Sequence, residues 1–275
     1  MVDAHELELY ASAVVVFGAG KPLLTALSAT RREERSPVQL LSAIWGRRPW
    51  ATAVVMVTML VMIGLQYTVH GLPDQLMRQP GALQDGQWWR VFTALFIQSS
   101  GLVQIVVNVG ALAVAGPIAE GVFGPRRWML IFFGSGMAAN ILSEEGWSRH
   151  GGGSSIAICG LVGALAATYL VRAGEFGPDL GEDPRRLRLM AFAVPAAGAF
   201  LCAIGNNHGA GLLAGCALGL VTAATARPGS LRLGRFAVAA GRGSTAQGVV
   251  RAVPAPCVTA GRGPCGSVDP GPGRR

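Results

Sequence analysis

The sequence predicts an all-α polytopic membrane protein, a bundle of six transmembrane helices followed by a disordered C-terminal tail. Two observations carry this prediction. Of the 275 residues, 51% are hydrophobic and only 14% are charged, whereas a typical soluble domain carries about 25% charged residues. The apolar residues also gather in six runs, at residues 51–69, 97–116, 127–142, 154–171, 189–204 and 208–226.

The length of each run decides whether it can cross a bilayer. A spanning helix needs about 20 predominantly apolar residues, within a range of roughly 17–25. Four runs meet that length, at residues 51–69, 97–116, 154–171 and 208–226. The runs at 127–142 and 189–204 are shorter. We expect all six to be spans.

The basic residues define an orientation. The net charge is +8, and arginine clusters lie before the first run, between the second and third, between the fourth and fifth, and after the sixth. They are Arg47, Arg48, Arg126, Arg127, Arg185, Arg186, Arg188, Arg227, Arg232 and Arg235. Cytoplasmic loops of membrane proteins carry such an excess of arginine. We therefore expect a multi-pass integral protein of the plasma membrane with both termini cytoplasmic, and no nucleic-acid partner.

Composition divides the chain into three parts. Residues 1–50 are expected to form an N-terminal cytoplasmic segment, in which the apolar patch 11–18 follows Asp3, Glu6 and Glu8 and lacks the basic start of a signal peptide. Residues 51–226 form the membrane domain. Residues 227–275 hold 10 glycines, 6 prolines, 8 arginines and one acid. That composition cannot build an apolar core, so we expect this tail to be disordered.

Two of the apolar runs begin with residues that can carry chemistry. Ser155 lies at the start of the fourth run and His208 at the start of the sixth. His208 precedes a stripe of glycines at every fourth position, Gly211, Gly215 and Gly219, on one helix face. Small residues allow close helix packing in lipid. Since both helices begin on the same side, we expect Ser155 and His208 to meet at one depth.

A serine beside a histidine is suited to acyl transfer. A hydroxyl is a weak nucleophile until a base takes its proton, and the reaction also needs donors for the developing oxyanion. Gln104 and Asn108 lie four residues apart on one face of the second run and are candidates for these donors. Interhelical hydrogen bonding is the alternative role for the two amides. Packing or a hydrogen bond back to its own helix is the alternative for Ser155, and a structural role is the alternative for His208.

These features together resemble the rhomboid family of intramembrane serine proteases over roughly residues 50–226. Four separate motifs carry the resemblance, and they occur in the order found in the family. They are Trp89-Arg90 followed by Val91-Phe92-Thr93, Glu120 with Gly124, Gly153-Ser154-Ser155-Ile156 followed by Gly160-Leu161, and His208 followed by Gly211 and Gly215.

The resemblance implies a serine endopeptidase that cleaves single-span membrane proteins near the outer face of the lipid bilayer without a cofactor. Ser155 would be the nucleophile and His208 the base. Asn108 would match the family's oxyanion asparagine, and Gln104 stands where many members have histidine. Ile156 departs from the usual small residue. A branched side chain beside the nucleophile leaves open a catalytically inactive, rhomboid-like protein that binds membrane helices.

Other classes of protein fit the sequence less well. His150 is an alternative base, but its glycine-rich setting gives it no fixed geometry. The HExxH pattern of a zinc protease is missing from the sequence. The five cysteines have no metal-ligand spacing. No acidic residue lies centrally in an apolar run, which argues against a proton-coupled transporter.

Overall fold

The computed structural model describes residues 4–27, 37–176, 183–227 and 231. All the secondary-structure elements named among these residues are helices. The helices are α1 (Ala4–Leu27), α2 (Pro37–Trp45), α3 (Trp50–Thr68), α4 (Leu72–Leu76), α5 (Trp89–Thr93), α6 (Gly101–Phe123), α7 (Pro125–Leu142), α8 (Ser155–Arg172), α9 (Pro184–Ala203) and α10 (Asn207–Thr225). Short helical turns cover Ala94–Phe96, Ser143–Trp147 and Ala173–Glu175. The all-α prediction is confirmed for this part of the chain. The predicted tail lies almost entirely outside it.

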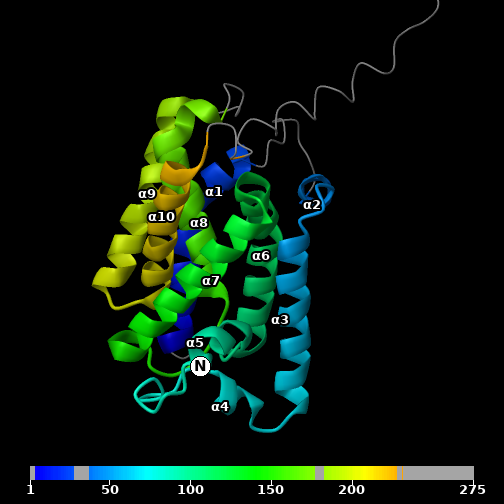
Figure 1. Cartoon of the computed structure of the whole chain (residues 1–275), viewed down its shortest axis with the longest axis vertical. Helices are drawn as coiled ribbons and strands as arrows, with labels where there is room; N and C mark the ends of the chain where they lie inside the picture. The colour runs from blue at the N-terminus through cyan, green and yellow to red at the C-terminus, as the bar shows by residue number, and fades with distance from the viewer. Residues whose placement is uncertain (1–3, 28–36, 177–182, 228–230, 232–275) are drawn as a thin grey trace, which may run out of the picture.

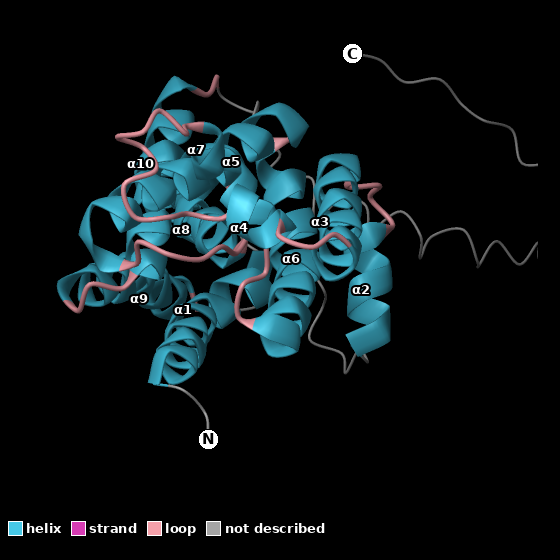
Figure 2. Cartoon of the chain, turned by 90° about the horizontal axis from the view of Figure 1, so that it is seen from below, coloured by secondary structure: helices cyan, strands magenta, loops and turns pink. Residues whose placement is uncertain are grey.

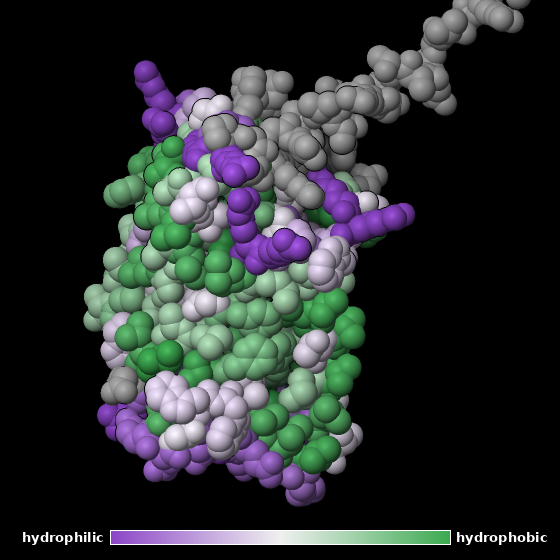
Figure 3. Space-filling model, viewed as in Figure 1, coloured by the Kyte–Doolittle hydropathy of each residue, from purple (hydrophilic) through white to green (hydrophobic). Residues whose placement is uncertain are grey.

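Among the described residues, five helices are long and apolar enough to cross a membrane: α3, α6, α8, α9 and α10. Hydrophobic side chains form a broad middle zone on the molecule, and hydrophilic ones gather at its two ends (Figure 3). The chain is therefore an integral multi-pass membrane protein. The remaining expected span, the run at residues 127–142, corresponds to α7, which has two arginines in its first turn and is not among the five. The count of six spans stays a prediction.

Helix α8 lies at the centre of the bundle. It contacts α1, α6, α7, α9 and α10. In its most apolar stretch 78% of the residues are buried, the highest share among the five candidate spans. Figure 1 shows the long helices side by side, with α4 and α5 at one end of the bundle and α2 at the other. Ser155 is the first residue of α8. It lies at the end marked by α4 and α5, because Gly151, just before α8, pairs with Arg78, just after α4.

The contact between α8 and α10 depends on glycine. A Cβ atom on Gly211 would meet the backbone of Ile156, and a Cβ on Gly215 would meet the backbone of Gly160. A Cβ on Gly219 would lie 2.6 Å from the carbonyl oxygen of Ala164. The three contacts repeat every four residues along both helices. This confirms the predicted glycine packing face and explains why the two helices approach backbone to backbone.

A buried carboxylate joins α3 to the end of α6. Glu120 is 5% exposed, and its two oxygens accept hydrogen bonds from the backbone N–H groups of Ala51 at 3.1 Å and Thr52 at 2.8 Å. These N–H groups lie in the first turn of α3, where they have no partner inside the helix. Gly124 then turns the chain into α7 with a φ of 74°. The acidic-glycine pair is thus a helix cap and a turn.

The segment at residues 1–50, expected to be cytoplasmic with a cytoplasmic or interfacial helix at 11–18, contains a helix that packs on the bundle. Helix α1 packs along α8 and α9, and Val16, Leu23 and Leu27 belong to the buried core. Seen from below, α1 lies between α9 and α6 (Figure 2). The apolar part of α1 extends well past the patch at 11–18, to Leu27, which gives the helix enough apolar surface to pack. The boundaries 1–50, 51–226 and 227–275 stay predictions.

The glycine contact generates a test of packing. Gly215→Ala should destabilise the protein by about 1–3 kcal/mol, the usual cost of overpacking, because the new methyl group meets the backbone of Gly160. Gly64→Ala on α3 is the matched control, since its methyl group would meet nothing within 4 Å. It should be neutral, or stabilising by up to about 1 kcal/mol. Equal thermal stability of the two variants in detergent micelles would contradict this account of the packing.

Candidate active site

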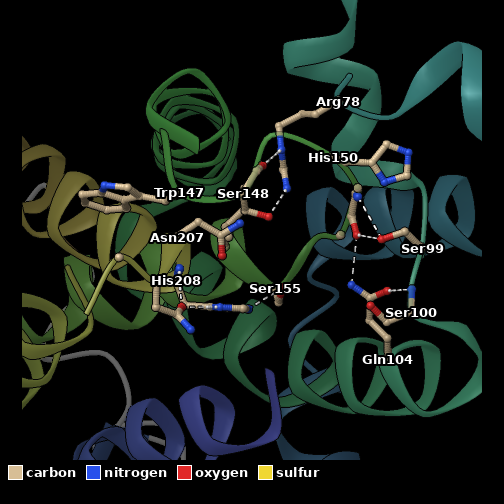
Figure 4. A pocket seen from close by; sticks show the side chains of 16 residues that line it. Arg78, Ser99, Ser100, Gln104, Trp147, Ser148, His150, Ser155, Asn207 and His208 are labelled. Atoms are coloured by element: carbon tan, nitrogen blue, oxygen red, sulfur yellow. Dashed lines mark hydrogen bonds between the residues drawn. The ribbon is translucent and has the colours of Figure 1, made fainter. Parts of the chain in front are cut away.

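A polar cavity of about 70 Å³ lies where the loops before α6, α8 and α10 meet. Its walls include Ser100 and Gln104, the segment Gly151–Gly153, and the first residues of α8 and α10. Figure 4 shows side chains from these separate segments pointing into one space. Residues far apart in the sequence therefore share one site, and Ser155 and His208 are both among them.

The two serines at the start of α8 have different surroundings. Ser154 is 1% exposed, and its hydroxyl donates to the sulfur of Met59 at 3.1 Å. Ser155 is half-buried and lines the cavity. The structure therefore directs the hydroxyl of Ser155, and not that of Ser154, toward the site.

His208 is the second residue of α10 and is 3% exposed. Its Nε2 atom lies 2.9 Å from the Oγ atom of Ser155, which is hydrogen-bond distance for a base and its nucleophile. The first glycine contact between the two helices joins Gly211, three residues after His208, to the backbone of Ile156, the residue after Ser155. Close packing of the two backbones thus brings a serine and a histidine from opposite sides of the interface into contact.

The side chain of Asn206 completes the surroundings of the histidine. Asn206 caps α10, and its Oδ1 atom accepts a hydrogen bond from the backbone N–H of His208 at 3.0 Å. The same oxygen lies 2.8 Å from Nδ1 of the imidazole. Ser155, His208 and Asn206 therefore form a continuous chain of hydrogen bonds, of which Figure 4 shows the contact between His208 and Ser155.

The two expected oxyanion donors lie at different distances from the cavity. Gln104 lines it, and its Nε2 atom donates to the carbonyl oxygen of Gly152 at 3.0 Å. Asn108 is buried one turn deeper, outside the lining residues, and its Nδ2 atom donates to Oε1 of Gln98 at 2.7 Å. One amide hydrogen of each side chain is thus engaged, and each amide carries a second hydrogen. Their role at an oxyanion stays a prediction.

The glycine segment before Ser155 is fixed by polar contacts. Ser99 Oγ lies 2.9 Å from the carbonyl oxygen of Gly152 and 3.0 Å from its nitrogen, and the N–H of Gly153 donates to Ala94 at 2.9 Å. A Cβ on Gly152 would lie 2.7 Å from the same Ala94 oxygen. Glycine is required here because the segment lies directly on the backbone of its neighbour. The contacts hold the approach to α8 in one position.

A buried arginine, Arg78, holds the part of the cavity lining that contains Ser148. Arg78 is 3% exposed, and it donates to the carbonyl oxygen of Ser148 at 3.1 Å and to Oδ1 of Asn140. Its backbone pairs with Gly151. Burial lowers the pKa of Arg78 to about 10, while the negative charge of Glu144 raises it. The guanidinium is therefore charged at neutral pH and ties the segment after α4 to the end of α7.

The alternative base lies elsewhere in the cavity. His150 is exposed and lines the cavity from the segment before the glycines. Figure 4 shows its ring beside Ser99, on the far side of the cavity from His208. The Ser155 hydroxyl lies within hydrogen-bond distance of His208. The geometry therefore favours His208 over His150 as a partner for Ser155.

Three residues of the site were missed by sequence reasoning: Asn206, Ser99 and Arg78. Asn206 had a readable signal, because asparagine directly before an apolar helix is a strong N-cap. The signal for Arg78 was weaker, because a single arginine in an outer loop is expected to be exposed to solvent. Ser99 had none, because its partner Gly152 lies 53 positions away.

Residues 85–228, more than half of the chain, match the family model of the Rhomboid domain. The chain therefore belongs to the rhomboid family. The matched region contains α6 through α10 and all of the residues that contact the imidazole of His208 described above.

Two curated relatives come from Bacillus subtilis (strain 168). The "Putative rhomboid protease YdcA" is 30% identical over 113 residues, which cover 40% of this chain and 55% of that relative. The "Rhomboid protease GluP" is 27% identical over 106 residues, which cover 38% of this chain and 21% of that relative. The chain thus spans about half the length of one relative and about a fifth of the other.

Proposed function

We propose that this protein is an intramembrane serine endopeptidase in which Ser155 is the nucleophile and His208 the general base. The observation that supports the proposal most directly is the distance of 2.9 Å between His208 Nε2 and Ser155 Oγ. Membership of the rhomboid family and the protease names of the two relatives point to the same class of enzyme. The substrates would be single-span membrane proteins.

The reaction follows from the arrangement of the cavity. His208 takes the proton of Ser155 as the hydroxyl oxygen attacks the scissile carbonyl carbon, which converts that carbonyl oxygen to an oxyanion. The imidazolium then gives the proton to the leaving amine, so the peptide bond breaks and an acyl-serine remains. A water molecule, deprotonated by His208, attacks the acyl-serine. The bond between the acyl carbon and Ser155 Oγ then breaks, the imidazolium returns the proton to Oγ, and the carboxylic acid is released. Both halves use one base, which alternates between accepting and donating a proton.

The oxyanion lies where the first turn of α8 can stabilise it. The initial N–H groups of a helix lack intrahelical partners and carry a partial positive charge. Ser155 is the first residue of α8, so the nucleophile belongs to the turn that carries these groups. The second amide hydrogens of Gln104 and Asn108 are the additional donors that we propose. Removal of a single oxyanion donor typically costs about 10²–10³ in kcat.

The location of the cavity supports cleavage near one membrane surface. It lies at the end of the bundle marked by α4 and α5, and its lining includes Arg78, Ser99 and Asn207. Polar walls of this kind admit the water that hydrolysis consumes. With the arginine clusters inside, this end is the outer one, and both chain termini would be cytoplasmic in the plasma membrane.

Ile156 is the feature that favours the alternative, a rhomboid-like protein that binds membrane helices without cleaving them. Its side chain is 2% exposed and belongs to the buried core, and the residue lines the cavity beside Ser155. A branched residue in this position narrows the space for a substrate carbonyl. Because the side chain is buried in the core, it would restrict the range of substrates without preventing catalysis.

The nucleophile is tested by a pair of adjacent substitutions. Ser155→Ala should reduce cleavage of a model single-span substrate in proteoliposomes to background, because the attacking oxygen is removed. Ser154→Ala should retain activity within about threefold, since it loses only a hydrogen bond to a thioether, a weak acceptor. Expression and thermal stability of both variants serve as controls. Full activity of Ser155→Ala would refute the assignment.

The steric role of Ile156 is tested against a second isoleucine of the same helix. Ile156→Ala and Ile158→Ala each remove a buried branched side chain, 2% and 1% exposed, so each should cost about 2–5 kcal/mol. Of these two isoleucines, Ile156 lines the cavity and Ile158 does not. Ile156→Ala should therefore raise cleavage or extend it to bulkier substrates, and Ile158→Ala should not. An identical substrate range in both variants would show that Ile156 does not restrict the site.

A further inference from the structure

Asn206 has a clear role in folding. It precedes α10 in an extended backbone conformation, with φ −92° and ψ 124°, and its Oδ1 atom accepts from the backbone N–H of His208 at 3.0 Å. This is the geometry of an asparagine N-cap, whose side chain satisfies one of the unpaired N–H groups of the first turn. The cap fixes the position of the amide group relative to His208.

The cap also determines which end of the amide faces the histidine. Oxygen and nitrogen of an asparagine amide are assigned from their hydrogen-bond partners. A backbone N–H can only donate, so the atom it meets must be Oδ1. The same oxygen lies 2.8 Å from Nδ1 of His208. Because Oδ1 is an acceptor, Nδ1 must carry a hydrogen.

The tautomer of the imidazole follows from this. A neutral imidazole carries one hydrogen on its two nitrogens. With Nδ1 protonated, Nε2 carries a lone pair that can accept a hydrogen, and Nε2 is the atom that lies 2.9 Å from Ser155 Oγ. The opposite tautomer would place an N–H against the serine hydroxyl and leave Nδ1 and Oδ1 as two acceptors in contact.

We propose that Asn206 is a positioning residue of this site, which holds His208 as the Nδ1–H tautomer with Nε2 directed at Ser155. The proposal rests on the function proposed above, and it extends the pair to a Ser155–His208–Asn206 triad. When Nε2 takes the serine proton, the Nδ1–H bond to Asn206 is unchanged, so the imidazolium forms without rearrangement. Helix capping and orientation of the base are two functions of one oxygen atom.

Substitutions at position 206 separate the two functions. Serine is as good an N-cap as asparagine, but its hydroxyl lies one bond closer to the backbone and does not reach Nδ1. Aspartate keeps an acceptor for both donors. Alanine keeps neither. The whole chain is used for each variant, and kcat and KM for a single-span substrate are measured beside thermal stability.

We expect Asn206→Ser to keep wild-type thermal stability and KM while kcat falls about a hundredfold, the lower end of what general-base catalysis contributes. Asn206→Asp should restore kcat to within about tenfold of wild type, and Asn206→Ala should lose both kcat and stability. The control is Asp183→Ser, which exchanges the N-cap of α9, a side chain that accepts from the N–H of Arg185 at 3.0 Å. It should leave kcat unchanged. Wild-type kcat in Asn206→Ser, or no recovery in Asn206→Asp, would overturn the proposal.

A spectroscopic measurement tests the proposal without relying on catalysis. The ¹⁵N chemical shifts of the imidazole nitrogens report which one carries hydrogen, and His208→Gln identifies the signals among the four histidines of the chain. Wild type should show Nδ1–H, and Asn206→Ser should show a mixture of tautomers. A protein that is Nδ1–H yet cleaves nothing would refute the proposed function alone. A wild-type His208 protonated on Nε2 would refute the role of Asn206 whatever the activity.

Discussion

The backbone contact between α8 and α10 is the constraint on which the rest of the structure depends. Glycines at 211 and 215 place α10 directly against the backbone of α8 at Ile156 and Gly160. Van der Waals packing of this kind drives helix association in lipid, where hydrophobic burial contributes little. Because the contact begins within a turn of both helix starts, it fixes Ser155 and His208 at one depth and on facing surfaces. A side chain at either glycine would separate them.

Hydrogen bonds at the end of the bundle hold the loop segments that line the cavity. Irregular backbone at membrane depth is tolerated only where its polar groups are satisfied by protein or water. The segment before α8 meets this requirement through Ser99, Gln104 and the backbone of Ala94. Arg78 performs the same function for the segment after α7. The cavity is therefore a polar pocket with fixed walls above a tightly packed apolar bundle, which is what hydrolysis beside a membrane requires.

The sequence predicted the features that depend on period and length. Apolar runs located the five candidate spans, and the four-residue glycine period predicted the face on which α10 packs. The contact between Ser155 and His208 was also predictable, because both residues begin apolar runs, whereas contacts with distant loop residues were not. Nothing local indicates that α1 packs on α8 and α9, or that Gln104 donates to Gly152 and Asn108 to Gln98, because those acceptors belong to loops without a periodic pattern. For Asn206, the capping role could be predicted from the sequence, but its contact with the imidazole of His208 could not.

The central claim is that this packing activates the Ser155 hydroxyl through His208. Reaction of the purified protein with a fluorophosphonate, followed by mass spectrometry of the labelled peptide, tests it most directly, because such probes phosphonylate an activated serine. The account predicts one adduct, on Ser155, whose rate of formation falls at least about a hundredfold in His208→Ala while the fold persists. An unlabelled wild-type protein, or equal labelling of Ser155 in His208→Ala, would contradict it.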